Sequence, residues 1–452
     1  MFKKILIANR GEIASKIVNS CLKLNIKPIC IYSKADSDLN YLNSAYQTIC
    51  IGNSNIQQSY LNEKKIFDIL EKYQCDAIHP GYGFFSENYL FAIKCKERKV
   101  NFIGPDLIFI KNMGDKLVAR QTMQNLNIPV IPGSISDNLS DSQIYKLAQD
   151  IGFPILIKAA AGGGGKGIKK ISSMYELKES INKCRFEAKQ LFGNSKVYIE
   201  KFIQKAKHIE LQVLGDKYGS VIHFNERDCS IQRNNQKIIE ETPAFNIDKA
   251  KLISLKNSAI NALKHIKYDN IGTLEFLLDK KNNYYFIEAN TRIQVEHAIT
   301  EMTTGQNLVD LQIRSSLGEH LRLSQNQIKQ KGHCIECRIN SEDSKNNFVP
   351  STGLIKYVKF PVNNRDIKVH TFVHSYLPIS PYYDSMIAKI VVHKKDRSSA
   401  LKTMQFCLNS ISVKGISTSL KIQRNIFTNN NFIFGVYNCD FLNIHLNTLL
   451  KY

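Results

Sequence analysis

The sequence has no tryptophan, only 11 prolines in 452 residues, and fewer acidic than basic side chains. No apolar stretch reaches the roughly 20 residues that span a bilayer, so we predict no membrane-crossing segment. The first residues, MFKKILIANRGEIA, enter a strand pattern without the apolar core of a signal peptide or the Ser/Arg-rich lead of a transit peptide. We therefore expect a cytoplasmic protein that has no membrane partner.

The 61 Lys and Arg residues outnumber the 40 Asp and Glu residues, for a formal net charge of +21. Such an excess is typical of nucleic-acid-binding proteins. Here, however, the basic residues are spread along the chain rather than gathered into an arm or stripe, and a drift in residue usage toward Lys and Asn gives the same total. A positive field also attracts small anionic substrates. We favour this second interpretation and predict no nucleic-acid partner; DNA affinity that persists at physiological salt would support the first.

The 11 cysteines are odd in number and lack the spacing of a disulfide framework, which indicates a reducing compartment. One Cys-x-x-Cys pair, Cys334 and Cys337, lies in HCIECRIN, which has a strand pattern. Side chains three positions apart on a strand point to opposite faces, so this pair cannot clamp one zinc ion. We interpret both cysteines as structural.

The first hundred residues alternate strand and helix, which predicts a Rossmann-like α/β unit with ligands at the ends of its strands. No GxGxxG fingerprint is present, so we do not predict a nicotinamide cofactor. The expected elements are a strand over Lys4–Ala8, a helix from Glu12, and strands over Lys27–Tyr32, Asp76–His79 and Asn101–Gly104.

The length predicts about three domains. A proline-containing joint, Ile128–Ser134, precedes a compact segment, and the middle of the chain has an α+β pattern. From Gly332 onward the pattern is mostly strands and turns, with a late helix near Ser398–Asn409. We predict an N-terminal domain over 1–112, a middle domain over 113–330 with a lid at about 131–203, and a mainly β C-terminal domain over 331–446.

A run of glycines, Gly162–Gly165 with Gly167, separates two predicted strands, Pro154–Ala160 and Ile168–Ile171. Consecutive glycines cost backbone entropy, but they let N–H groups converge on an anion and let a loop swing. A strand follows the loop and no GxxxxGK[ST] motif is present, so this is not a Walker A loop. The alternatives are a flexible surface hairpin and a lid over nucleotide phosphates. The flanking lysines favour the lid; they are Lys158 and Lys166, and Lys116 can add a further phosphate contact.

A predicted hairpin pairs strand Thr273–Asp279 with strand Tyr284–Ala289 across a four-residue loop. If Asp279 faces Tyr284, then Glu275 lies directly opposite Glu288. Facing like charges destabilise a sheet unless a cation bridges them, and Mg²⁺ and Mn²⁺ favour carboxylate oxygens. The alternative, two solvated surface carboxylates, is weakened because both strands are otherwise apolar.

The side-chain alternation can be followed past this hairpin. In an extended chain, five polar groups would share one face over about 26 Å. Metal-binding carboxylates, a guanidinium and a separate carboxylate base together suit phosphoryl or acyl transfer. The five residues are Glu288, Asn290, Arg292, Gln294 and Glu296.

Motifs along the whole chain resemble those of the biotin carboxylases, the ATP-grasp subunits of acetyl-CoA carboxylases. They occur in the family's order and spacing: KILIANRGEIA, HPGYGFFSEN, MGDK, GGGGKG, ERDCSIQR, EANTRIQVEH, ECRINSED and PYYDSMIAK. The resemblance implies an ATP-grasp fold and a reaction in which bicarbonate and ATP give carboxyphosphate. Carbon dioxide from carboxyphosphate then carboxylates N1′ of biotin.

The resemblance also implies residue roles on the nucleotide side. Two lysines hold phosphates under the glycine lid, further residues surround adenine and ribose, and two Mg²⁺ or Mn²⁺ ions bind beside the ATP. The implied ATP-binding residues are Lys116, Lys158, Gly162, Gly163, Gly164, Gly165, Lys166, Gly167, Glu200, Lys201, Ile203 and His208. The implied metal-binding residues are Glu275 and Glu288, with Asn290 close by.

On the other side, the resemblance implies that Glu296 takes the proton of bicarbonate, because this weak nucleophile needs a positioned base and cationic groups. Arg338 stabilises the biotin enolate, since a guanidinium stays charged at any working pH. Tyr82 lies near the ureido ring. The implied bicarbonate-binding residues are Lys237, Arg292, Gln294 and Val295.

Some positions depart from the family's pattern. Asn235 replaces a usual His, which removes a contact expected for ribose or phosphate, and Lys16 and Lys166 replace common arginines, which loses the bidentate fork. Two more departures lie in the C-terminal domain: the stretch Asp366–His370, and Tyr376, where Gly is usual. They affect positions expected to take part in packing or dimer contacts.

The sequence contains no biotinyl-lysine AMKM motif. We therefore expect biotin as a substrate carried by a separate biotin carboxyl carrier protein, with carboxyltransferase subunits as further partners and a homodimer as the family's assembly. This favours acetyl-CoA carboxylase over the pyruvate, propionyl and methylcrotonyl relatives. Competing hypotheses are another ATP-grasp ligase, such as a carbamoyl phosphate synthetase half, and a non-catalytic regulatory subunit. The motif ECRINSED argues against the first, and the complete set of carboxylates with Lys237 argues against the second.

Overall fold

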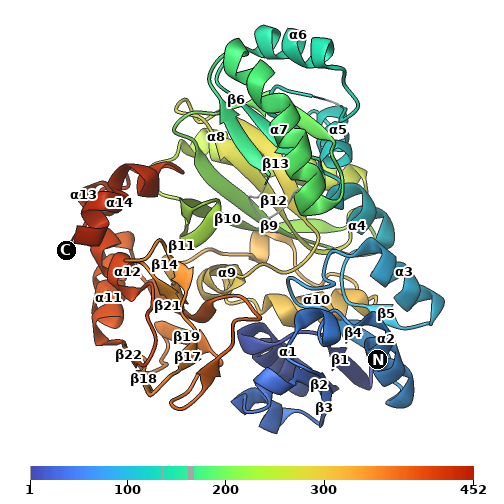
Figure 1. Cartoon of the computed structure of the whole chain (residues 1–452). Coiled ribbons are helices and arrows are strands. Elements are labelled where there is room, and N and C mark those ends of the chain that lie inside the picture. The colour runs from blue at the N-terminus through green and yellow to red at the C-terminus, as the bar shows by residue number, and fades with distance from the viewer. Residues whose placement is uncertain (1, 135, 161–166, 452) are drawn as a thin grey trace.

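The structure is a computed structural model that describes residues 2–134, 136–160 and 167–451. Figure 1 shows the N-terminal strands and helices in blue, a green projection at the top, and the C-terminal elements in orange and red at the left. The glycine loop residues Gly162, Gly163, Gly164, Gly165 and Lys166 lie outside the described residues. Within the described ranges, no helix is both long and apolar enough to cross a membrane.

The N-terminal part is a parallel sheet with helices beside it (Figure 1). Its elements are β1 (Lys4–Ile7), α1 (Gly11–Lys23), β2 (Lys27–Ser33), β3 (Gln47–Gly52), α2 (Glu63–Lys72), β4 (Ala77–His79), α3 (Tyr89–Glu97), β5 (Asn101–Phe102), α4 (Leu107–Gly114) and α5 (Lys116–Asn125). The strand order is β3-β2-β1-β4-β5. This is the order of a Rossmann-like half, as the alternation predicted. Buried Ile13 and Ile17 of α1 pack against Ile5 and Ile7 of β1.

The green projection in Figure 1 is the predicted lid. It contains α6 (Asp141–Ile151), β6 (Ile155–Ala159), β7 (Ile168–Ile171), α7 (Met174–Phe192) and β8 (Val197–Lys201). β6 pairs antiparallel with β7, which confirms the predicted hairpin, and with β8 on its other edge. Gly167 has a φ of +70°, and a Cβ there would lie 2.8 Å from Phe192. Glycine is therefore required at this position by both backbone and packing.

An eight-stranded antiparallel sheet joins the middle and C-terminal parts of the chain, in the order β13-β12-β9-β10-β11-β14-β21-β19. Its strands are β9 (Lys207–Gly215), β10 (Val221–Arg233), β11 (Gln236–Thr242), β12 (Asn270–Leu278), β13 (Tyr284–Asn290), β14 (His333–Asn340), β19 (Ile367–Thr371) and β21 (Met386–Lys394). The helices between them are α8 (Lys249–His265), α9 (His297–Thr304) and α10 (Leu308–Ser316). The sheet thus runs across the boundary that we predicted near residue 330.

The β12–β13 hairpin has the predicted carboxylate pairing but not the predicted closing pair. Tyr284 faces Leu278 rather than Asp279, so a regular ladder would have shifted Glu275 out of register with Glu288. A bulge between these two pairs restores the register, because β13 has one extra residue, Ile287, opposite the Glu275–Phe276 step of β12. Glu275 therefore lies opposite Glu288 for a reason that alternation alone did not supply.

The remaining C-terminal elements surround the end of the large sheet. They are β15 (Glu342–Asp343), β16 (Val349–Pro350), β17 (Gly353–Leu354), β18 (Tyr357–Lys359), β20 (Pro378–Ile379), α11 (Arg397–Ser410), β22 (Ser412–Lys414), α12 (Leu420–Ile426), α13 (Asn430–Ile433) and α14 (Phe441–Lys451). The predicted late helix is α11. α12, α13 and α14 were not predicted, because helices of 7, 4 and 11 residues give too few turns for a clear period. Tertiary packing of Leu420, Phe432 and Phe441 stabilises them.

The two cysteines of the Cys-x-x-Cys pair pack into different clusters, as expected for opposite faces of β14. Cys334 packs with Ala298 and Val391, whereas Cys337 belongs to the main core. Burial raises the pKa of both thiols well above the usual value. Neither thiol is a reactive thiolate, which agrees with a structural role.

Tyr376 occupies the position where the resembling family usually has glycine, and its φ of +70° explains that preference. The side chain is 75% exposed, so it gains little from packing in return. We expect Tyr376→Gly to raise the thermal unfolding midpoint, because the left-handed conformation costs a non-glycine residue about 1 kcal/mol. Tyr382→Gly is the control, since Tyr382 is also exposed but lacks a positive φ. An equal decrease in both variants would contradict the strain argument.

Candidate active site

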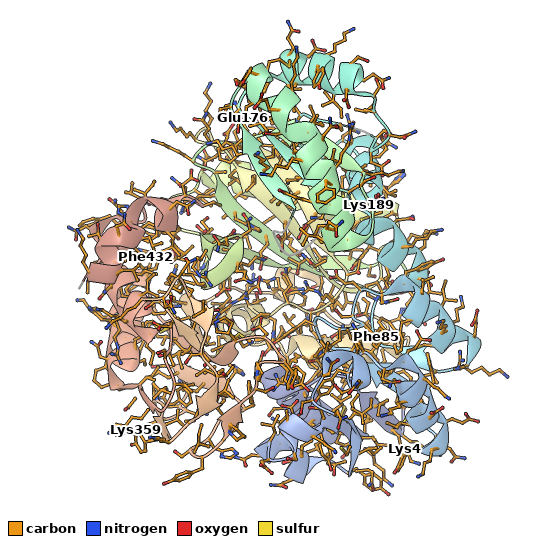
Figure 2. The ribbon with its side chains drawn as sticks, in the orientation of Figure 1. Lys4, Phe85, Glu176, Lys189, Lys359 and Phe432 are labelled. Atoms are coloured by element: carbon orange, nitrogen blue, oxygen red, sulfur yellow. The ribbon has the colours of Figure 1, made fainter. Side chains whose placement is uncertain are left out.

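A cavity of about 1210 Å³ lies where the lid, the N-terminal loops and the large sheet meet. In Figure 2 the lid helix α7, marked by Glu176 and Lys189, lies above Phe85, and Phe432 lies at the left. With the exception of Gly167, every predicted site residue in the described part of the chain lines this cavity. These residues are Tyr82, Lys116, Lys158, Glu200, Lys201, Ile203, His208, Lys237, Glu275, Glu288, Asn290, Arg292, Gln294, Val295, Glu296 and Arg338.

Glu275 and Glu288 face each other from neighbouring strands in the cavity wall. Glu275 Oε2 lies 2.9 Å from His208 Nε2, and Glu288 lies 3.3 Å from Lys116 Nζ. Asn290 turns its amide nitrogen, not its oxygen, toward Glu275 at 2.9 Å. Two facing carboxylates open to a cavity are the donors that Mg²⁺ and Mn²⁺ prefer, so the pair fits a divalent cation.

Lys237 on β11 is paired with three buried carboxylates. Its Nζ lies 2.5 Å from Glu210, 2.8 Å from Glu275 and 2.7 Å from Glu296. Burial alone would lower the pKa of Lys237, but these three carboxylates raise it well above its usual value. The ammonium therefore stays charged and connects Glu275, on the metal-binding side, with Glu296 on the other side.

The polar ladder predicted beyond Glu288 does not extend as one strand. β13 ends at Asn290, the chain turns, and α9 begins at His297. Gln294 donates from Nε2 back to Glu275 Oε1 at 2.7 Å. The turn thus gathers side chains that an extended strand would have spread over about 26 Å.

Glu296 lies at the end of this turn, only 2% exposed. Its Oε2 accepts a hydrogen bond from Arg338 Nη2 at 3.0 Å, and its Oε1 contacts Lys237. Burial would raise the pKa of Glu296, but Lys237, Arg338 and Arg227 together lower it well below the usual value. The side chain is therefore an ionised carboxylate between cations.

Arg292 is oriented by a residue that our sequence analysis did not single out. Its Nε donates to Glu87 at 2.9 Å, and its Nη2 donates to Asn290 Oδ1 at 2.9 Å. Glu87 belongs to the HPGYGFFSEN loop after β4. Burial would lower the pKa of Arg292, and Glu87 raises it above the usual value, so a fixed cation faces the cavity.

The side of the cavity expected to face biotin has its own charge network. Tyr82 donates from its hydroxyl to Glu12, and Glu12 pairs with Lys389 at 2.9 Å. Arg338 donates from Nε to Glu240 at 2.6 Å. Glu12, Lys389 and Glu240 come from α1, β21 and β11, so three parts of the chain set the positions of the two predicted residues.

On the nucleotide side, the predicted residues contact one another. Lys158 pairs with Glu200, and Arg120 lies 3.6 Å from the same carboxylate. Lys201 donates to the backbone oxygens of residues 152 and 153 at 3.0 and 3.1 Å. His208 also contacts Gln232 at 2.8 Å through Nδ1. Lysine and carboxylate partners that pair across a cavity can separate when an anionic ligand enters.

Comparison with known proteins agrees with this geometry. The profile of the biotin carboxylase N-terminal domain matches residues 1–110, and that of its C-terminal domain matches residues 336–444. The profile of the carbamoyl-phosphate synthase L chain ATP-binding domain matches residues 115–324. Biotin carboxylase 1 of Bacillus subtilis is 43% identical over 445 residues, which cover 98% of each chain. The chain belongs to the biotin carboxylase family.

Other relatives act in different carboxylases. The 2-oxoglutarate carboxylase small subunit of Hydrogenobacter thermophilus is 41% identical over 98% of this chain and 94% of its own length. A crystal structure of the biotin carboxylase domain dimer from that organism's enzyme, with MgADP, ADP and bicarbonate, has a TM-score of 0.96, 41% identity and coverage of 100% and 99%. A biotin carboxylase–βγ-ATP complex from Campylobacter jejuni has a TM-score of 0.95, 42% identity and coverage of 98% and 99%.

Membership identifies an ATP-dependent ligase of ATP-grasp fold that uses ATP and a divalent metal, with biotin carried on a partner. Two departures from the family's pattern have local explanations in this biotin carboxylase. Lys16 forms an ion pair with Glu301 at 2.6 Å, so the lysine keeps the positive charge of the usual arginine and pairs it with a carboxylate. Asn234 and Asn235 form the two-residue turn between β10 and β11 with φ of +50° and +63°. Asn tolerates that conformation better than most residues.

A fully buried arginine behind this biotin carboxylase site was missed by our sequence analysis. Arg227 on β10 is 0% exposed and contacts Glu210, Gln212 on β9 and Gln294 after β13. A usable signal was present, because Glu210 and Gln212 share one face of an otherwise apolar strand. The same alternation identified Glu275, and applying it to β9 would have found them.

Proposed function

We propose that this biotin carboxylase is the subunit of an acetyl-CoA carboxylase that carries out the first half-reaction of malonyl-CoA synthesis for fatty acids. Biotin reaches it on a separate biotin carboxyl carrier protein, and carboxyltransferase subunits use the product. Relatives called biotin carboxylase in Bacillus subtilis and Nostoc, 43% identical and covered over 98% of their length, support this assignment. A homodimer is proposed because the Hydrogenobacter thermophilus relative is described as a dimer.

The observation that carries the proposal is the single ammonium of Lys237 between Glu275 and Glu296. In our assignment, Glu275 and Glu288, with Asn290 beside them, hold the metal at the phosphates of ATP. Lys116 and Lys158 bind those phosphates, and Glu200, Lys201, Ile203 and His208 surround the nucleoside. A divalent metal held there would supply positive charge that stabilises the negative charge on the phosphates.

Bicarbonate binds in our proposal between Lys237, Arg292, Gln294 and the backbone of Val295. A carboxylate held by two cations is a weak base, so Glu296 must first share those cations with the incoming anion. Its pKa then rises and it removes the bicarbonate proton, which leaves an oxygen able to attack the γ-phosphorus of ATP. ADP leaves, and carboxyphosphate forms where the two groups of residues meet.

Carboxyphosphate then breaks into carbon dioxide and phosphate, the phosphate takes the proton from N1′ of biotin, and that nitrogen adds to the carbon dioxide. Arg338 provides a fixed positive charge for the enolate-like ureido oxygen. Tyr82 stands on the same side of the cavity, so we place the ureido ring near it.

The first test is bicarbonate-dependent ATP hydrolysis by the full chain with magnesium, measured with and without free biotin. We expect free biotin to increase the rate of hydrolysis. A rate that biotin does not change would reject biotin as the carboxyl acceptor. Omission of magnesium is the control, because the facing carboxylates then lack their cation.

The second test concerns the acceptor beyond biotin, because close relatives serve 2-oxoglutarate and methylcrotonoyl-CoA carboxylases. Carboxylated carrier protein made by this chain is mixed with acetyl-CoA and an acetyl-CoA carboxyltransferase, and malonyl-CoA is measured. We expect malonyl-CoA to form. Carboxyl transfer only with a 2-oxoglutarate carboxylase large subunit would assign the chain to that enzyme instead.

A further inference from the structure

Two buried glutamates that the proposed mechanism does not use face each other beside Arg338. Glu240 on β11 is the direct cross-strand partner of Glu336 on β14, and both are 0% exposed. Partners in an antiparallel ladder point to the same face with their Cβ atoms close together. The two carboxyl groups are therefore neighbours inside the protein.

The partners of these carboxyl groups are unequal. Glu240 Oε1 lies 2.6 Å from Arg338 Nε and 2.5 Å from Nη2. Glu240 Oε2 and both oxygens of Glu336 have no hydrogen-bond partner among the described residues. Two ionised carboxylates in this arrangement would repel each other, and one of them would be buried without any donor.

The nearest other cation is already committed elsewhere. Lys389 faces Arg338 from β21, but its Nζ lies 2.9 Å from Glu12 and donates to the backbone oxygen of Val295 at 2.5 Å. One proton on the pair removes the repulsion, because a protonated Glu336 is neutral and has an O–H that can donate to Glu240 Oε2. The charged and titratable groups around the pair are Lys237 of β11, Arg338, Cys334 and Cys337 of β14, Lys389 of β21, Cys229 of β10, Tyr82 after β4 and Glu296 before α9.

We propose that Glu240 and Glu336 share one proton, and that the pair, with a net charge of −1, positions Arg338 for the biotin half of the reaction. The inference rests on the proposed function of Arg338. Arg338 lies between two single negative charges, the pair on one side and Glu296 on the other. When Glu296 takes the bicarbonate proton, Glu240 still holds the guanidinium in place.

The electrostatics of the pair agree with its geometry. Burial raises the pKa of both carboxyl groups, and it raises that of Glu336 further than that of Glu240, where Arg338 opposes the shift. The proton is therefore retained at neutral pH and lost as the pH rises. A doubly charged pair then draws Arg338 toward β11 and away from the cavity, so the biotin-dependent rate falls on the alkaline side.

Infrared spectroscopy tests the shared proton without reference to activity. A protonated carboxyl group has a C=O stretching band that a carboxylate lacks. We expect wild type at pH 7 to show such a band that disappears in Glu336→Gln and shifts in Glu240→Gln. A spectrum in which neither variant alters this region would overturn the proposal, whether or not biotin stimulates ATP hydrolysis.

Kinetics tests the positioning role. In Glu240→Gln the ratio of biotin-dependent to biotin-independent ATP hydrolysis should fall at least tenfold, with the KM for ATP within about twofold of wild type. In Glu336→Gln the amide mimics the neutral acid, so the alkaline decline should move up by at least one pH unit. An alkaline decline at the wild-type pH would overturn the inference.

Glu241→Gln is the matched control for both variants. Glu241 is the next residue on β11, is 2% exposed, and pairs with Arg397 and His333 instead of with Arg338. It should lower stability and leave the pH profile of the biotin-dependent rate at its wild-type position. If the alkaline decline shifted equally in this control, the loss of any buried charge on β11 would be enough to shift it. The assignment to the Glu240–Glu336 pair would then be rejected.

Discussion

Replacing Glu296 by Gln should reduce bicarbonate-dependent ATP hydrolysis by about 10²- to 10⁴-fold, the usual contribution of a general base. Gln keeps the shape of the side chain but accepts no proton. Nucleotide affinity should stay within about twofold of wild type, because Lys116 and Lys158, which we propose bind the phosphates, pair with Glu288 and Glu200 and not with Glu296. Turnover is measured with saturating bicarbonate, and ATP affinity by equilibrium titration.

The control for this prediction is Glu226→Gln. Glu226 is equally buried, at 1% exposed, and pairs with Lys256 at 2.6 Å, but it does not line the cavity. Its loss should lower stability while hydrolysis stays within about twofold of wild type. If Glu296→Gln abolished ATP binding, or turned over at the rate of the control, Glu296 would not be the base.

Arg227→Met should lower the thermal unfolding midpoint by roughly 10 °C and also reduce turnover. Removing one partner of a buried ion pair costs about 3–5 kcal/mol, because the other charge stays buried, and each kcal/mol shifts a unit of this size by a few degrees. Glu210 would keep only Lys237 as a cation. Gln294 would also lose the donor at 2.8 Å that orients it.

Two controls separate geometry from charge in this prediction. Arg227→Lys keeps the charge but cannot contact Gln212, Thr273 and Gln294 through a planar fork, so an intermediate midpoint is expected. Arg314→Met removes a pair whose arginine is 46% exposed, and it should shift the midpoint by about 1 °C or less. An Arg227→Met midpoint as close to wild type as that of Arg314→Met would contradict the buried-pair argument.

Local patterns were sufficient wherever one strand or one hairpin decides the outcome. The alternation of β1 and β2 predicted the parallel unit, and the polar positions of the β12–β13 hairpin predicted that Glu275 meets Glu288. Even there, the residue predicted to face Tyr284 was wrong by one position, and a bulge brought Glu275 back into register with Glu288. A bulge depends on twist and on packing against neighbouring strands, which a two-strand pattern does not contain.

Patterns failed wherever a residue's role depends on contacts from several segments. Arg227 is defined by Glu210, Gln212 and Gln294, which come from β9 and from the turn after β13. Alternation connects Glu210 with Gln212, but no sequence period connects these two positions with Arg227 or Gln294. The prediction of an extended polar ladder beyond Asn290 was wrong for a related reason. Hydrogen bonds across the site, and not side-chain alternation, determine where the chain turns.

The sequence by itself predicted which side chains gather at the cavity, because carboxylates and lysines inside apolar strands are costly unless they are used. It predicted that Glu275 faces Glu288, but the bulge that brings them into register came from the tertiary structure. Only the tertiary structure decided that Lys237, Glu296 and Arg338 meet. They come from β11, the turn before α9, and β14, and the order of the large sheet brings these distant segments together around one buried ammonium.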